Sequence, residues 1–295
     1  PTAVSPVNPS RPWLSLLKEL YAPPSPEEAR RHNETYGKLL VDLGLATRDQ
    51  IARCLASPAD PRRPFPRLSQ LLIDQGVLSL SKLKGSVVAR AAEDPDNRIG
   101  AYVLVGNLHR ETWKAWDSTR RDWVELTFVG AEELGGLRAR AKVVHPALAA
   151  ILDFGIAEGR SYVVMESISG IRLAASPRTD RRRLIEAVRD AAYGVAALHS
   201  KKLFHGAISP ETLLLDSEGR GRLTGWGSGT DDVRSLAAAL YEALTDRPAP
   251  KEGIPRAWPK RLDPAMRMLF EKALGGRRLT AKAFAESLSP LLGAF

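Results

Sequence analysis

The feature that most constrains the fold is a change in the spacing of apolar residues near residue 181. Before this point, short apolar runs bounded by polar and turn residues predict strands over 102–105, 112–116, 123–129, 148–153 and 161–165, with a helix over 131–143. After it, apolar residues recur at helical spacing over 184–198, 233–244 and 266–274. Strands followed by helices indicate an α+β fold of two lobes, the first small and β-rich, the second helical.

One loop of the helical part carries an ordered set of small and polar residues. Residues 205–215 read H-G-A-I-S-P-E-T-L-L-L, and residues 225–227 read G-W-G. These motifs resemble the catalytic loop, H-R-D-x-K-P-E-N, and the metal-binding turn, D-F-G, of protein kinases. In that family the loop Asp orients the substrate hydroxyl, while the loop Asn and the D-F-G Asp hold magnesium on the ATP phosphates.

The positions that carry this chemistry are replaced. Ala207, Thr212 and Gly225 stand where the family has the base and the two metal ligands, and Ser209 stands where it has the loop Lys. Ala and Gly have no carboxylate. The resemblance therefore implies that the frame is kept without a catalytic base, without a metal site and without a bound cofactor.

Further short motifs of the family occur in the family's order over residues 99–295. They lie at 145–148 (H-P-A-L for H-P-N-I), 162–166 (gatekeeper and hinge), 198–199 (L-H), 232–236 (D-V-R-S-L for D-V-Y-S-L) and 277–281 (R-R-L-T-A). The chain thus resembles a bacterial serine/threonine protein kinase, with an N-lobe at about 99–166 and a C-lobe at about 167–295. The resemblance implies structural roles for His205 and for Asp232, which accepts hydrogen bonds from the loop backbone in the family.

The elements that would hold ATP also depart from the family. The segment 106–111 has one glycine where a glycine-rich loop is expected, and Thr127 replaces the phosphate-pairing Lys. The position of the glutamate that pairs with this Lys falls near Gly136. Only four residues separate Gly227 from Asp232, so the activation segment is predicted to be absent.

An internal repeat precedes this region. Residues 36–47 recur at an offset of 32 as residues 68–79, with apolar residues at helical spacing, glycines at helix C-caps and Thr47 or Ser79 at the next N-cap. The pattern predicts a small all-α domain over 27–92, preceded by an arm at 1–26 and followed by a linker at 93–98.

The repeat resembles the N-terminal domain of type II secretion ATPases (the GspE-N or MshEN type), some members of which bind cyclic di-GMP through an Arg and a Gly of each repeat. Of these residues, this chain keeps Arg67 in the second copy and Gly37 in the first. A docking module is the favoured interpretation of the repeat, and a cyclic-dinucleotide sensor is the alternative.

Composition and charge bear on whether the chain binds nucleic acid, crosses a membrane or forms disulfides. The net charge is +9, but the basic residues look dispersed and no nucleic-acid motif accompanies them, so a solvated basic surface is favoured over nucleic-acid binding. No apolar run approaches the roughly 20 residues that cross a bilayer. The single cysteine, Cys54, cannot form an internal disulfide and is expected to be buried, and the start shows no signal-peptide pattern, which favours a cytoplasmic location.

We therefore expect a catalytically inactive pseudokinase that acts as a protein-binding scaffold or regulatory subunit for an unidentified partner. The alternative is a signalling adaptor that responds to a cyclic dinucleotide. An enzyme of altered chemistry would need replacement carboxylates in the cleft, for which Glu125, Glu132 and Asp153 are the candidates, but their spacing does not support this reading.

Overall fold

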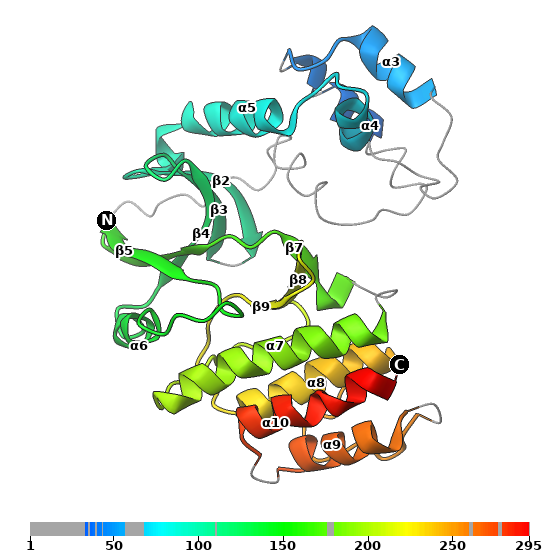
Figure 1. The fold of residues 1–295 in the computed structure, drawn as a ribbon. Coiled ribbons are helices and arrows are strands. Elements are labelled where there is room, and N and C mark those ends of the chain that lie inside the picture. Colours follow the sequence, from blue (N-terminus) through cyan, green and yellow to red (C-terminus); the bar gives the residue numbers. More distant parts are fainter. Residues whose placement is uncertain are drawn as a thin grey trace. The chain divides into compact units, whose positions relative to one another are not determined.

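A computed structural model describes residues 33–34, 36–38, 40–42, 44–56, 68–109, 111–175, 180–259, 262–276 and 279–294 (Figure 1). The chain is mixed α+β, as its sequence predicts, and it divides into two compact units, one ending at Thr127 and one beginning at Phe128. We call them the first and the second unit. The predicted arm at 1–26 lies outside the described residues.

The first unit begins with helices, among them α3 (Arg48–Ala56), α4 (Leu68–Asp74) and α5 (Leu80–Ala92). Gly44 and Gly76 have φ values of +64° and +68°, and each ends its helix in the turn that the repeat predicts. Thr47 Oγ1 accepts from the backbone N–H of Gln50 at 3.2 Å, and Gln50 Oε1 accepts from that of Thr47 at 2.8 Å, a capping box at the start of α3.

The helices of the first unit share a core with a strand. Buried residues from both copies of the repeat pack in one cluster with β2, and they include Tyr36, Leu40, Cys54, Leu68, Leu72, Leu78, Val87, Val103 and Val105. Residues 93–98, which the sequence predicts as a linker, contain a 3-10 turn (Pro95–Asn97) in which the buried Asn97 side chain donates to the carbonyl of Ala91 at 2.9 Å. This segment therefore packs against the end of α5, and the domain boundaries proposed there stay predictions.

Four antiparallel strands follow in the order β1 (Arg98–Ile99), β2 (Tyr102–His109), β3 (Thr112–Asp117) and β4 (Asp122–Val129). The pairing of β2 with β3 shifts register between Leu104 and Gly106 and again between Asn107 and His109. His109 still pairs with Thr112, so strand structure continues where the sequence places a shortened glycine-rich loop.

The second unit surrounds a long helix, α7 (Arg181–Ser200), which is buried along most of its length. It also contains α6 (Leu134–Arg140), the hairpin β5 (Ile151–Ala157) and β6 (Arg160–Glu166), and the sheet β7 (Gly170–Arg172), β8 (Leu213–Asp216) and β9 (Gly221–Leu223). Figure 1 shows α7 beside α8 (Asp232–Thr245) and α10 (Ala281–Leu288), and α9 (Pro264–Leu274) packs on α8. These helices and the sheet β7–β9 form one apolar core.

Among the described residues, no helix combines the length and the hydrophobicity that spanning a lipid bilayer requires.

Candidate functional site

Asp232, the first residue of α8, holds the loop that resembles a catalytic loop. Its Oδ2 accepts from the backbone N–H of His205 at 2.8 Å and lies 3.0 Å from His199 Nε2, while Oδ1 accepts from the N–H of Gly206 at 2.8 Å. The side chain is 2% exposed. Asp232 therefore makes the backbone contacts that the resemblance implies.

The charge of Asp232 is stabilised by these contacts. Burial alone would raise the pKa of Asp232, but the hydrogen bonds from His199 and from the N–H groups of Gly206 and His205 outweigh it and lower the pKa below its ordinary value of 3.8. The carboxylate is thus ionised at neutral pH, and its two oxygens are engaged by the loop.

His205 is sealed in the interior. Its side chain is fully buried, its ring packs against Trp226 with centroids 4.7 Å apart and planes tilted by 35°, and neither ring nitrogen has a hydrogen-bond partner among the described residues. Burial lowers the pKa of His205, the charge of Asp232 opposes this shift and the charge of Arg140 adds to it, and together they bring the pKa to about 4. The imidazole is therefore neutral at pH 7 and contributes packing.

The segment that follows Trp226 lies directly on this loop. The N–H of Gly227 donates to the carbonyl of His205 at 3.0 Å, and the N–H of Gly229 donates to that of Gly206 at 3.1 Å. Gly206 has φ of +76°, and a Cβ there would clash with the carbonyl of Gly227 and lie 2.8 Å from that of Gly229. A Cβ at Gly227 would clash with the carbonyl of Gly206 in turn. Two backbones thus pack where side chains have no room.

The four degenerate loop positions lie near one another. The Thr212 hydroxyl donates to the carbonyl of Ala207 at 2.6 Å and accepts from the N–H of Ser209 at 2.9 Å. The Ser209 hydroxyl accepts from the N–H of Glu211 at 3.2 Å, and a Cβ at Gly225 would come within 3.7 Å of the Thr212 methyl group. Both hydroxyls therefore serve the conformation of the loop.

The remaining degenerate positions, Thr127 and Gly136, belong to different units. Thr127 on β4 faces Thr112 on β3, and their hydroxyl oxygens lie 3.1 Å apart. Gly136 is an exposed residue of α6, and a Cβ there would meet no atom within 4 Å. Neither position presents a charged group to a nucleotide.

Arg140, at the end of α6, is a residue of this site that sequence reasoning missed. Its Nη2 donates to the carbonyl of Gly227 at 3.0 Å, and its guanidinium lies 5.4 Å from the centre of the Trp226 ring. Burial lowers the pKa of Arg140 from its ordinary value. No residue pattern in the sequence marks this contact, because the acceptor is a backbone carbonyl 87 residues away.

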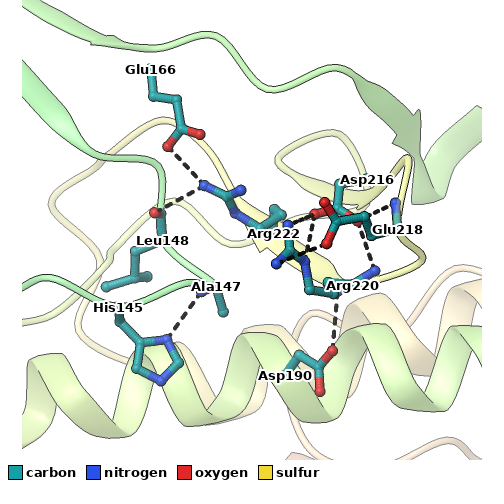
Figure 2. Close-up of polar contacts among 10 residues, drawn as sticks. His145, Ala147, Leu148, Glu166, Asp190, Asp216, Glu218, Arg220 and Arg222 are labelled. Carbon is teal, nitrogen blue, oxygen red and sulfur yellow. Dashed lines mark hydrogen bonds and ion pairs between the residues drawn. The ribbon is translucent and has the colours of Figure 1, made fainter.

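A second polar cluster ties the end of β6 to β9 (Figure 2). Arg222 Nη2 donates to Glu166 Oε2 at 2.7 Å, and that oxygen also accepts from the N–H of Ala150 at 3.2 Å. The backbones of Leu223, Ala147 and Ala149 exchange hydrogen bonds of 2.8 Å beside this ion pair. The segment at the predicted hinge is therefore fastened to the sheet below it. Sequence reasoning also missed this ion pair.

The candidate replacement carboxylates lie on three separate elements. Glu125 on β4 pairs with Lys114 on β3, Glu132 is exposed before α6, and Asp153 is exposed on β5, where its Oδ1 accepts from the N–H of Phe154 at 2.8 Å. Within the described ranges, no group of three His, Cys, Asp or Glu residues is placed to hold a metal ion.

The two residues that resemble dinucleotide ligands are treated differently by the structure. A Cβ at Gly37 would lie 3.3 Å from Ile51 Cγ2 and 3.4 Å from Leu68 Cδ2, so this backbone packs against apolar side chains. Arg67 lies outside the described residues. Cys54 is buried, as expected, and its sulfur lies 3.0 Å from Gln75 Oε1.

Comparison with known proteins shows a distant relationship to protein kinases. No known family model matches the chain. It is 25% identical over 144 residues to a probable serine/threonine-protein kinase of Bifidobacterium longum, a match that covers 48% of this chain and 18% of that protein. It is 35% identical over 66 residues to a probable serine/threonine-protein kinase of Dictyostelium discoideum, covering 22% and 10%. The matched segments thus span less than a fifth of either relative, and the similarity to serine/threonine protein kinases is weak.

Proposed function

We propose that this chain is a pseudokinase: a two-lobed, kinase-like protein that binds other proteins as a scaffold or regulatory subunit, without ATP–Mg binding or phosphotransfer. The observation that carries the proposal is the packing of the backbone at 227–229 on the loop at 205–207. We call residues 227–229 the strap, and their shortness and close packing support the proposal because an active kinase needs an open loop and a substrate platform.

The chemistry supports the same reading. Phosphoryl transfer depends on positioning and on charges that stabilise the transition state. Ala207, Thr212, Gly225 and Thr127 supply none of the charged groups that the family uses. Loss of one such group typically costs on the order of 3–4 kcal/mol of transition-state stabilisation, so their combined loss leaves little to accelerate the reaction.

The scaffold role rests on what is kept. The Asp232 contacts fasten the loop at 205–206 and the Glu166–Arg222 pair fastens the end of β6, which supports a frame that is kept apart from catalysis. A fold of this kind acts on other molecules through its surfaces. Binding of a protein partner is the function that needs no more than a rigid frame.

A nucleotide screen tests the inactive state. The purified chain is melted with ATP, ADP or GTP, each with and without magnesium, and incubated with radiolabelled ATP and casein beside an active serine/threonine kinase as control. We expect no magnesium-dependent rise in melting temperature and no labelled casein. Saturable binding of ATP–Mg, or transfer above the level without enzyme, contradicts the proposal.

A further inference from the structure

The positive charge of the chain is concentrated, contrary to the dispersed distribution expected from its short clusters. Residues 247–282 contain ten Lys and Arg against three Asp and Glu, and so carry +7 of the net +9. The described part of this segment comprises the loop that follows α8, then α9, and the first residues of α10, while four of the ten cations (Lys260, Arg261, Arg277 and Arg278) lie outside the described residues. A net charge of +7 on so short a stretch attracts an acidic partner.

A groove opens within this basic segment. It has a volume of about 460 Å³, and the described residues that line it are Gly253, Ile254, Met268, Glu271, Lys272 and Gly275. Two of the lining side chains are apolar and exposed, Ile254 at 44% and Met268 at 58%. Glu271 is neutralised by Arg267 at 2.9 Å, whereas the exposed Lys272 has no ion pair among the described residues.

The groove is held open by contacts beneath it. Arg234 on α8 donates to the carbonyls of Pro250 at 2.7 Å, of Gly253 at 3.3 Å and of Leu274. These bonds join the loop on one side of the groove to the end of α9 on the other. A preformed site of this kind loses little conformational entropy when it binds.

An aromatic cluster fixes the same loop. Trp258 stacks on Phe270 of α9 with ring planes 6° apart, and both rings meet Tyr241 of α8 edge to face. The loop therefore keeps its conformation although it contains no helix or strand in its described part. The groove is a feature of the rigid fold.

We infer that this groove binds an acidic and apolar peptide segment of a partner protein. Carboxylates of such a segment would meet Lys272, and its aliphatic side chains would cover Ile254 and Met268. A nucleic acid would use the charge and leave the apolar pair uncovered. The volume suits a few side chains of an extended or helical segment.

This inference deepens the proposed scaffold role, on which it rests for the class of its partner. None of the groove residues belongs to the loop at 205–212. The nucleotide screen and the peptide measurement therefore fail independently: ATP–Mg binding would end the pseudokinase proposal and leave the groove untouched.

The test is a titration of the purified chain into a short fluorescein-labelled peptide in which glutamates flank leucine pairs, followed by anisotropy at low salt. We expect saturable binding that weakens about tenfold in Lys272→Glu and about fivefold in Met268→Ser. Lys82→Glu, an equal change of charge at an exposed position of α5, is expected to leave the affinity unchanged. Thermal melting checks that each variant is folded.

Three further probes decide between occupants: the peptide with serine for leucine, a polyuridine RNA and a phosphatidylserine vesicle. We expect each to bind more weakly than the acidic and apolar peptide. The inference is overturned if that peptide does not bind saturably. It is equally overturned if RNA or vesicles bind more tightly than that peptide, since the surface would then recognise a nucleic acid or a lipid bilayer.

Discussion

His205 and Asp232 couple the stability of the second unit to pH, both in the same direction. The pKa of His205 is about 4 in the folded chain, compared with an ordinary value of 6.5. Between pH 6.5 and about pH 4, His205 is therefore protonated in the unfolded state and neutral in the folded state. Stability falls as the pH drops through this window. The lowered pKa of Asp232 adds stability that is present above about pH 4 and is lost as the pH falls through its folded value.

His205→Phe isolates the first of these contributions. The variant keeps a ring against Trp226 and removes two nitrogens that have no partner among the described residues. We expect the loss of stability between pH 6.5 and pH 4 to shrink by up to about 3 kcal/mol. Urea denaturation at a series of pH values measures it. The remaining slope comes in part from His145, whose pKa burial also lowers. An unchanged slope would mean that His205 is accessible to protons in the folded chain.

Gly206→Ala tests the contact between the two backbones. Gly206 and Gly219 have nearly the same φ, +76° and +77°, but a Cβ at Gly219 meets no atom within 4 Å. Gly219→Ala is therefore expected to cost only the strain of the left-handed conformation, about 1–2 kcal/mol. Gly206→Ala is expected to cost about 2 kcal/mol more, because the strap must move. Equal free energies of unfolding for the two variants would show that the strap is not tightly packed.

At the scale of elements, α6 is fastened to the strap by one side chain. Arg140→Met removes the hydrogen bond to Gly227 and the contact with Trp226 and is expected to destabilise the chain by about 1–2 kcal/mol. Arg138→Met, on the same helix, loses a contact with Phe154 at 5.9 Å and is expected to cost less than about 0.5 kcal/mol.

Hydrogen exchange locates this effect. Amides of α6 are expected to exchange faster in Arg140→Met than in Arg138→Met, because local opening of the helix no longer breaks the bond to the strap. If the amides of α6 exchange at the same rate in both variants, Arg140 does not hold the helix in place.

Sequence reasoning succeeds at elements whose signals are local. The caps at Thr47 and Gly44, the helical spacing along α7 and the role of Asp232 depend on residues close in the chain or on a motif of fixed order. It fails where partners are distant and chemically ordinary. Arg140 contacts a carbonyl 87 residues away, and any carbonyl would serve, so no pattern marks the pair.

The same limit applies to packing. Val103 and Val105 read as ordinary strand residues, and nothing in their neighbourhood shows that they join the core of the helical repeat. Arg234 reads as one more surface cation of a helix, although it binds three carbonyls. A side chain that binds the backbone of another segment does not need a particular residue type there. No sequence pattern therefore marks the contact.

At the scale of the whole molecule, restoring the charged groups is not expected to restore the activity. In a variant with Thr127→Lys, Ala207→Asp, Thr212→Asn and Gly225→Asp, the strap still covers the loop and β2 still runs to His109 without a glycine-rich loop. We expect calorimetry to show no ATP–Mg binding and a phosphotransfer assay to show no product. The unaltered chain and an active kinase serve as controls. Activity in the variant would mean that only the missing side chains separate this chain from an enzyme.

The facing glycines also bear on how such a chain can change over generations. Gly206 stands where active kinases have the arginine of H-R-D. A side chain at Gly206 would clash with the carbonyl of Gly227, and a side chain at Gly227 would clash with the carbonyl of Gly206. If an arginine replaces Gly206 before the strap changes, the strap is displaced. If the strap lengthens before Gly206 changes, the loop at 205–207 loses its support. For the pseudokinase that we propose, each of these two changes is harmful without the other, so the contact that stabilises the loop would also keep descendants of this chain inactive.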